Sequence, residues 1–388
     1  MQGPRALLAA AAVSVLAACA TNLPAPQPPA QAPAAEPLAA DPVPLPEPGP
    51  VKVALLLPLT GQAAPVGQSM LNAAQLALFD AAGDGFELLP RDTAGTPEGA
   101  QAAARDALAE GADLILGPLL SQSVGAVKPV ARASGVPVLA FSNDWTHADA
   151  GTWVMGLVPQ EQVRRVVGYA RAQGLSRVGA LVPATPYGNA VADALRTSAD
   201  RFGADIVRVE RYDAAAPDAS PAVRSLASAG PAAFDAVMIA EGGEKLRTMA
   251  PMLSYFEIDP RRVRLLGTGQ WDDPATGREA TLVGGWYAAP DPGARAGFEE
   301  RYAEFYGAAP HRLATLAYDA TALAARLAQF GDLGPAALTE PSGFIGTDGV
   351  FRLLPGGVVE RGLAVLEVTR AGPRVVDPAP SSFEPLLQ

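Results

Sequence analysis

The sequence predicts an α/β protein with two lobes, each built on a doubly wound parallel sheet. Short apolar runs alternate with helical patterns along the chain, and this order places helices on both faces of a parallel sheet. The alternation starts again after residue 159, so the unit occurs twice. The stretch from residue 51 to about 375 is also longer than one hydrophobic core usually supports. Two lobes are therefore expected.

The first series of elements runs from residue 51 to an extended crossing expected at Thr152–Pro159. Val51–Pro58 is an apolar run that Pro58 and Gly61 close, which is typical of a buried strand. Pro97 fits the first turn of the second helix. The expected strands are 51–58, 86–90, 113–116 and 136–141, and the expected helices are 65–82, 97–110 and 122–134.

The second series begins with an amphipathic helix at Gln160–Gln173 and repeats the alternation. The expected strands are 178–182, 205–211, 234–240, 263–267 and 286–289, and the helices are 187–202, 221–228, 245–255, 294–306 and 312–330. We expect residues 349–352 and 364–369 to form an antiparallel pair. The predicted lobes are 51–157 with 290–338 and 158–289 with 339–375, followed by a flexible tail at 376–388.

The first 18 residues have the pattern of a signal peptide, with Arg5 before the apolar stretch Ala6–Ala18. This stretch is too short to span a bilayer. The tetrapeptide Leu16-Ala17-Ala18-Cys19 resembles a bacterial lipobox, so lipidation of Cys19 is expected; the alternative is an ordinary secretory leader with an incidental cysteine. Cys19 is the only cysteine, which excludes an internal disulfide. Membrane contact is expected through the lipid anchor only.

The residue after the cysteine and the segment that follows it indicate the localisation of the protein. Ala20 stands where an aspartate would retain the protein in the inner membrane, by resemblance to the enteric sorting pattern, and so implies the periplasmic face of the outer membrane. Inner-membrane anchoring and a free periplasmic form remain alternatives. From Ala20 to Pro50, eleven of 31 residues are proline, so residues 19–50 are expected to be a lipidated tether without a fold, either extended or a plain disordered spacer.

Charge and motifs exclude several classes of function. The net charge of −11 argues against binding to nucleic acid, which needs a basic surface. His147 and His311 lack the spacing of metal ligands, and Gly267-Thr268-Gly269 lacks the third glycine of a dinucleotide motif. The chain has no Walker loop and no Gly-x-Ser-x-Gly elbow. We therefore expect no enzyme, no catalytic residue, no metal site and no cofactor.

Several motifs, taken in order, resemble those of type I periplasmic binding proteins, above all the receptors for branched-chain amino acids. They are 51–60, Arg91-Asp92-Thr93, Ile115-Leu116-Gly117-Pro118-Leu119-Leu120-Ser121, Val136-Pro137-Val138-Leu139-Ala140-Phe141-Ser142-Asn143 and Pro186-Tyr187-Gly188. The resemblance covers residues 51 to about 370. It implies two lobes that are joined by three crossings and close on a small polar ligand in the cleft between them.

The same resemblance suggests candidate ligand-binding residues. Ser121 begins the helix where this family holds an amino acid's carboxylate, and helix N-termini favour anions; a plain helix cap is the alternative. In the second lobe, Tyr187 matches a tyrosine that lines the cleft, with a packing role as the alternative. Glu241 is the nearest substitute for the acid that holds a ligand's ammonium. The candidates are Ser121, Ser142, Asn143, Thr146, Tyr187, Glu241 and Gln270.

Asp144 fits a carboxylate ligand poorly, because like charges repel, and a capping role is the alternative for it. The expected cleft thus keeps the carboxylate end of an amino acid site and loses the ammonium end.

A narrower resemblance links the chain to penicillin-binding protein activators of the LpoA type. It rests on the lipobox, the proline-rich tether, Ser142-Asn143 and the stretch from Gly267 through Trp271-Asp272 and Gly284-Gly285-Trp286-Tyr287 to Pro290-Asp291-Pro292. The resemblance implies a non-enzymatic lipoprotein that activates a bifunctional penicillin-binding protein in peptidoglycan synthesis. The helical-repeat domain of the best-known members has no room between Cys19 and Val51. The alternative is a substrate-binding protein that delivers branched-chain amino acids or related small molecules to an ABC permease.

Overall fold

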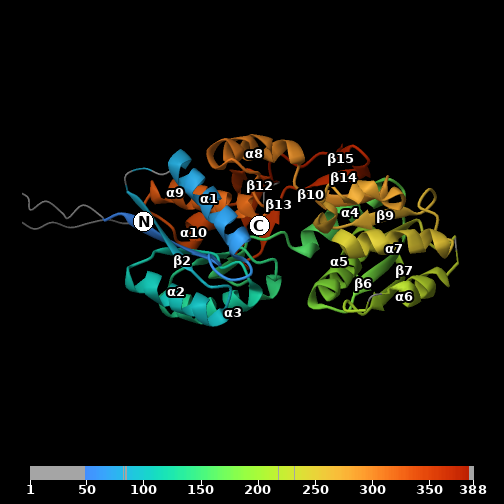
Figure 1. The fold of residues 1–388 in the computed structure, drawn as a ribbon, viewed down its shortest axis with the longest axis horizontal. Coiled ribbons are helices and arrows are strands. Elements are labelled where there is room, and N and C mark those ends of the chain that lie inside the picture. The colour runs from blue at the N-terminus through green and yellow to red at the C-terminus, as the bar shows by residue number, and fades with distance from the viewer. Residues whose placement is uncertain (1–48, 82, 84, 217, 231, 384–388) are drawn as a thin grey trace, which may run out of the picture. The chain divides into compact units, whose positions relative to one another are not determined.

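The computed structural model describes residues 49–81, 83, 85–216, 218–230 and 232–383. The predicted signal peptide, the lipidation site Cys19 and the tether up to residue 48 lie outside these residues. The described chain contains two large sheets and a small one, with helices on both faces of each large sheet (Figure 1). Within this part of the chain, no helix combines the length and the apolar character needed to cross a bilayer.

The first large sheet is parallel throughout and has the strand order β2-β1-β3-β4-β5. Its strands are β1 (Val51–Leu57), β2 (Phe86–Asp92), β3 (Leu114–Leu116), β4 (Val138–Ala140) and β5 (Thr152–Val154). The alternating side chains of β1 face opposite ways: Leu55 packs towards α1 (Ala64–Ala81) and α9 (Ala314–Ala328), and Leu56 packs towards α2 (Pro97–Ala109) and α3 (Ser121–Ala133). This burial on both faces explains the continuous apolar runs in the sequence.

The second large sheet has the order β15-β14-β10-β9-β8-β6-β7 and is parallel from β10 to β7. Its strands are β6 (Arg177–Pro183), β7 (Asp205–Tyr212), β8 (Ala236–Ile239), β9 (Arg264–Gly267), β10 (Trp286–Ala289), β14 (Ala364–Thr369) and β15 (Gly372–Asp377). One face packs on α4 (Pro159–Ala172) and α5 (Pro186–Phe202), and the other on α6 (Ser220–Ala227) and α7 (Gly243–Tyr255). The prediction of two doubly wound sheets is confirmed.

The C-terminal strands differ from the sequence prediction. Residues 349–352 and 364–369 do not pair: β12 (Gly349–Leu353) lies between β11 (Phe344–Gly346) and β13 (Val359–Arg361), and β14 joins the second large sheet. The small sheet belongs to the first lobe, because Phe351, Leu353 and Val359 share the buried cluster of β1. Of the segment 339–375 predicted to belong to the second lobe, the part that forms β11 to β13 is therefore misassigned, whereas β14 and β15 do join the second large sheet. Local patterns cannot tell which of two sheets a short strand joins.

The chain passes between the two large sheets three times, after β5, after β10 and between β13 and β14. After β10, α8 (Pro292–Tyr306) packs on α1 through Phe298 and Tyr302, and the short α10 (Pro335–Leu338) follows α9. The prediction of a flexible tail is wrong where it begins, since residues 376–377 belong to β15. Beyond them the Phe383 ring lies 4.5 Å from the Arg352 guanidinium, and residues 384–388 lie outside the described chain.

Helix starts follow local sequence signals. Thr96 and Thr185 cap α2 and α5, each accepting a hydrogen bond from the backbone N–H three residues later, and a proline follows each cap. Gly117 after β3 has φ +91°, and a Cβ at this position would lie 2.3 Å from the Leu56 carbonyl oxygen. Only glycine fits this turn. The turn delivers the chain into α3, whose first residue is Ser121.

Candidate functional site

Ser121 stands at the first position of α3, at the end of the turn that follows β3. Its hydroxyl donates a 2.5 Å hydrogen bond to Asp144 Oδ2 and lies 3.0 Å from His147 Nε2. The helix has no side-chain cap, so the alternative reading of Ser121 as a plain helix cap is wrong. The hydroxyl predicted to meet a ligand's carboxylate is thus already bound to a carboxylate of the same chain.

Asp144 holds its own loop together. It caps the short 3₁₀ helix Trp145–His147, and its Oδ1 accepts hydrogen bonds from the backbone N–H (3.1 Å) and the hydroxyl (2.6 Å) of Thr146. This confirms the capping alternative for Asp144. Desolvation opposes ionisation, but the hydrogen bonds from Ser121 and Thr146 outweigh it and lower the pKa of Asp144. The carboxylate therefore remains charged at neutral pH.

Ser121, His147 and Asp144 are the residue types of a hydrolytic triad, but their arrangement differs from one. In a triad the histidine bridges the other two residues, with the serine on one ring nitrogen and the acid on the other. Here Asp144 Oδ2 contacts the serine directly and lies 3.6 Å from Nε2, the same nitrogen that faces the serine. The Ser121 hydroxyl donates its proton to Asp144 rather than to His147, so the histidine does not activate this serine as a nucleophile.

The other candidates on this loop have separate surroundings. Ser142 is buried, and its hydroxyl accepts a hydrogen bond from the Asp144 backbone N–H at 3.0 Å. Thr146 is exposed, and its hydroxyl donates a hydrogen bond to Asp144. Asn143 is exposed on the same loop. The structure therefore brings Ser121, Ser142 and Thr146 together around Asp144.

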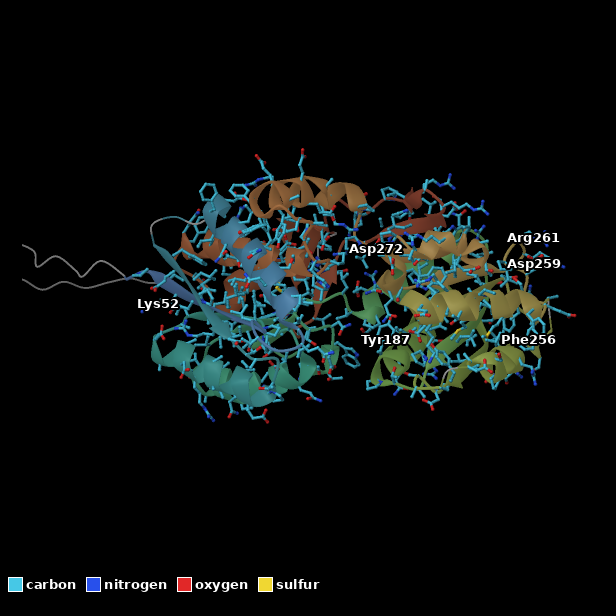
Figure 2. The ribbon with its side chains drawn as sticks, viewed as in Figure 1. Lys52, Tyr187, Phe256, Asp259, Arg261 and Asp272 are labelled. Atoms are coloured by element: carbon cyan, nitrogen blue, oxygen red, sulfur yellow. The ribbon has the colours of Figure 1, made fainter. Side chains whose placement is uncertain are left out.

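In the second lobe, Tyr187 lies at the start of α5 (Figure 2), and its hydroxyl is 2.7 Å from Thr268 Oγ1. Burial raises the pKa of the Tyr187 hydroxyl, and the nearby Glu241 charge raises it further. Thr268 also caps the 3₁₀ turn Gly269–Trp271, which contains Gln270. Gln270 packs against Gly242, the residue that follows Glu241. Tyr187, Glu241 and Gln270 are thus gathered at the ends of β8 and β9.

Glu241 is held by its neighbours. Tyr212 donates a 2.6 Å hydrogen bond to Glu241 Oε2, and the Gly242 backbone N–H donates to Oε1 at 3.2 Å. Burial and then this hydrogen bond raise the pKa of Tyr212, so the phenol stays a donor. Sequence reasoning did not identify Tyr212, because it lies 29 residues from its partner at the end of another strand.

Asp272 is the acid that follows β9, and sequence reasoning did not select it as a site residue. Figure 2 labels Asp272. Its Oδ2 lies 3.2 Å from Arg295 Nη2 and 3.3 Å from Arg312 Nε, and Tyr287 donates to its Oδ1 at 3.3 Å. The Asp272 side chain is only 7% exposed and that of Arg295 12%. The two arginines come from α8 and from the segment before α9, on the first lobe.

Glu241, the acid expected to receive a ligand's ammonium, is thus hydrogen-bonded to Tyr212, and Asp272, the acid that follows β9, is paired with two guanidinium groups of the chain itself. Near Ser121, likewise, the position for a ligand's carboxylate is taken by Asp144. The groups predicted to hold the two charged ends of an amino acid, Ser121 and Glu241, therefore each already have a hydrogen-bond partner within the chain. Among the described residues, no group of three or more His, Cys, Asp and Glu side chains has an arrangement that would hold a metal ion.

The comparisons with known proteins agree with this fold. The family described as "Periplasmic binding protein" matches residues 50–353. A curated protein of Rickettsia prowazekii (strain Madrid E), described as uncharacterized, is 24% identical over 217 residues, which are 56% of this chain and 55% of that protein. The chain thus spans about half the length of this curated relative.

Solved structures share the fold at low identity. A protein provisionally described as a branched-chain amino acid ABC transporter from Rhodospirillum rubrum is 19% identical, with a TM-score of 0.73, over 84% of this chain and 100% of the other. The leucine-, isoleucine-, valine-, threonine- and alanine-binding protein of Brucella ovis is 18% identical, with a TM-score of 0.68, over 86% and 93%. At such identities the similarity shows the fold alone.

Proposed function

Because the chain belongs to the periplasmic binding protein family, we propose that it is a periplasmic lipoprotein that activates a bifunctional penicillin-binding protein. It carries out no chemistry of its own and acts through contact with the synthase. Cys19 carries the lipid anchor, and the proline-rich segment up to residue 50 lets the lobes reach across the periplasm from the outer membrane.

One observation carries the proposal: the Ser121 hydroxyl is bound to Asp144 at 2.5 Å. An amino acid's carboxylate would have to displace Asp144 or lie beside it. Two carboxylates side by side in a partly buried site repel each other strongly. At the other end of the ligand, Glu241 accepts a hydrogen bond from Tyr212, and the nearby Asp272 is paired with Arg295 and Arg312. A receptor for free amino acids needs both ends available, whereas a protein that acts through a partner does not.

The second candidate is a substrate-binding protein of an ABC importer for branched-chain amino acids or related small molecules. The names of the Rhodospirillum rubrum and Brucella ovis structures favour it. Tyr187, Glu241 and Gln270 would then line the ligand from the second lobe.

Two measurements on the mature, full-length protein test these candidates. In a thermal-shift screen, leucine, isoleucine, valine and the other amino acids leave the melting temperature unchanged if the protein is an activator. A ligand at a hundred times its Kd would add about 2.7 kcal/mol of stability. In a glycan polymerisation and crosslinking assay, the protein raises the rate of a purified bifunctional penicillin-binding protein from the same organism.

The outcomes separate the two functions. Stabilisation by an amino acid without stimulation of the synthase overturns the activator proposal in favour of the importer. Failure to stimulate any of the organism's bifunctional synthases also overturns it, provided that the added protein keeps its folded circular dichroism spectrum.

A further inference from the structure

A broad groove lies on the first lobe, between the last part of α1, α9, the segment around α10, and β11. It shares no residue with the Ser121 cluster. Since α1 starts after the carboxyl end of β1 and runs back along the sheet, Asp80 near its end lies towards the opposite edge of the sheet from Ser121. The groove therefore forms a separate surface of the molecule.

The size of the groove favours a macromolecular occupant. Its volume is about 1240 Å³, whereas pockets for small molecules measure roughly 300–1,000 Å³. Two large apolar side chains on the groove are strongly exposed: Phe330 at 75% and Ile345 at 89%. Single exposed apolar residues are ordinary, but grouped along a concave surface they mark an interaction site.

The charge of the lining favours a cationic occupant. Four carboxylates line the groove, those of Asp80, Asp319, Asp332 and Glu340, against the single guanidinium of Arg326. Asp80 is already paired with Arg301 and accepts a hydrogen bond from Tyr318. Asp332 and Glu340 are exposed on the loops on either side of α10.

Asp319 supplies a second, independent observation. Its side chain lines the groove although the residue is only 3% exposed. Oδ1 accepts hydrogen bonds from the backbone N–H and the hydroxyl of Thr347 at 2.7 and 2.9 Å, and Oδ2 has no hydrogen-bond partner among the described residues. Burial raises the pKa of Asp319 to about 6, although the nearby Arg361 charge opposes this. A buried acceptor without a donor is costly, and a donor from a bound partner would relieve that cost.

β11 offers a strand edge beside this acid. It is the outer strand of the small sheet, and within the described part of the chain it pairs with β12 on one side only. Gly346 of β11 passes so close to Asp319 that a Cβ there would lie 2.4 Å from Oδ2. An extended segment can add to such an edge through its backbone, with alternate side chains directed to the two faces.

We propose that this groove binds an extended segment of a partner protein in which lysine or arginine alternates with apolar residues. The cationic side chains face Asp319, Asp332 and Glu340, and the apolar ones cover Ile345 and Phe330. The inference rests on the proposed function in that it takes the partner to be a protein. Peptide binding is measured without any synthase. Its result can therefore contradict the groove proposal without contradicting the activator function, and the synthase assay can do the reverse.

The test uses the full-length mature protein and three acetylated, amidated heptapeptides in isothermal titration calorimetry. The probe is Lys-Val-Lys-Val-Lys-Val-Lys; glutamate replaces lysine in the second peptide, and serine replaces valine in the third. We expect the probe to bind and the other two to bind at least about tenfold more weakly, because one loses the charge and the other the apolar contacts.

Variants locate the binding. Ile345→Ser and Glu340→Lys each weaken the probe by about fivefold or more, and both positions are exposed, so the fold persists. The matched controls on the second lobe are Val207→Ser, at a residue that is 39% exposed, and Asp193→Lys, at a carboxylate that is 69% exposed. Both controls leave the affinity unchanged. Asp319→Asn adds a test of the buried acid and weakens the probe in the same way.

Two results overturn the proposal. One is the absence of binding by the probe at millimolar concentration. The other is equal weakening in the groove variants and the control variants, which would mean general attraction of a basic peptide to an acidic protein.

Discussion

At the scale of single residues, the carboxylate of Asp144 determines what the Ser121 site can accept. Asp144 lies 23 residues after Ser121 in the chain and meets it at the ends of neighbouring strands β3 and β4. It brings a negative charge to the start of a helix, where the backbone amides would otherwise favour an external anion. The protein thus supplies its own anion at this position.

Replacing Asp144 with alanine is expected to create an anion site. The change frees the Ser121 hydroxyl and the first amides of α3, so 50 mM acetate should raise the melting temperature of the variant by about 2 °C. The wild type should not respond. Asp218→Ala is the matched control, because Asp218 accepts hydrogen bonds from Ser220 two residues later, as Asp144 does from Thr146. An equal response of both variants to acetate contradicts the interpretation.

Asp319 is a buried acid whose ionisation opposes folding. Its pKa is raised from 3.8 to about 6, first by desolvation, while Arg361 and the hydrogen bonds from Thr347 oppose the shift and the Asp348 charge adds to it. The folded protein therefore binds a proton more tightly than the unfolded chain does. The resulting stability is fully present below about pH 4 and is lost as the pH rises through about 6.

Asp319→Asn should remove this pH dependence. The free energy of unfolding of the variant, relative to the wild type, is expected to rise by about 1 kcal/mol between pH 5 and pH 7.5. Urea unfolding at the two pH values measures this difference. Comparing the two proteins cancels carboxylates such as Asp235, whose pKa is lowered by its hydrogen bonds to Arg177 and which titrates in the opposite sense. A difference that stays constant with pH would refute the prediction.

At the scale of elements, each lobe has a glycine in the helix that follows its first strand, packed against the backbone at the end of that strand. A Cβ on Gly67 in α1 would lie 2.0 Å from the Pro58 carbonyl oxygen, and one on Gly188 in α5 would lie 1.9 Å from that of Pro183. Each glycine lets its helix approach the end of the strand closely. The sequence predicted both helices, but it did not reveal this contact, because the spacing of two backbones is a tertiary property.

Gly188→Ala is expected to destabilise the protein by about 1–3 kcal/mol, because the methyl group forces α5 away from β6. Gly297→Ala is the matched control: Gly297 lies inside α8, and a Cβ there would meet nothing within 4 Å. The control should gain about 0.5–1 kcal/mol from the better helix propensity of alanine. Guanidinium unfolding measures both changes, and a loss of stability in both variants would show that the close contact is not the cause.

At the scale of the whole molecule, Asp272 connects elements on either side of the second crossing. It follows β9 in the second lobe, and Arg295 and Arg312 reach it from the first. Arg312 also lies 3.3 Å from the buried Asp348 in the turn between β11 and β12. These ion pairs connect the two lobes in addition to the three chain crossings. Removal of its shared acid leaves two guanidinium groups without their main partner.

Asp272→Asn should cost about 3–5 kcal/mol, the usual loss when one member of a buried ion pair is removed. Urea unfolding followed by tryptophan fluorescence reports on both lobes, since Trp153 and Trp271 are buried in different cores. Asp259→Asn is the matched control, because Asp259 pairs with Arg261, which is 89% exposed, and should leave stability unchanged (Figure 2). Equal effects of the two changes would contradict the connecting role of Asp272.

The sequence by itself determined the fold class, the two-lobed plan and most of the strands and helices from β1 to α9; it placed a crossing at Thr152–Pro159, where the structure has β5 as the last strand of the first sheet. These follow from local signals: burial on both faces gives continuous apolar strands, and Pro97 fits the first turn of its helix. Only the tertiary structure decided which sheet β12 joins and which partners Ser121, Glu241 and Asp272 have. The partners of these side chains lie 15 to 40 residues away on other elements, and no local periodicity records a contact of that kind.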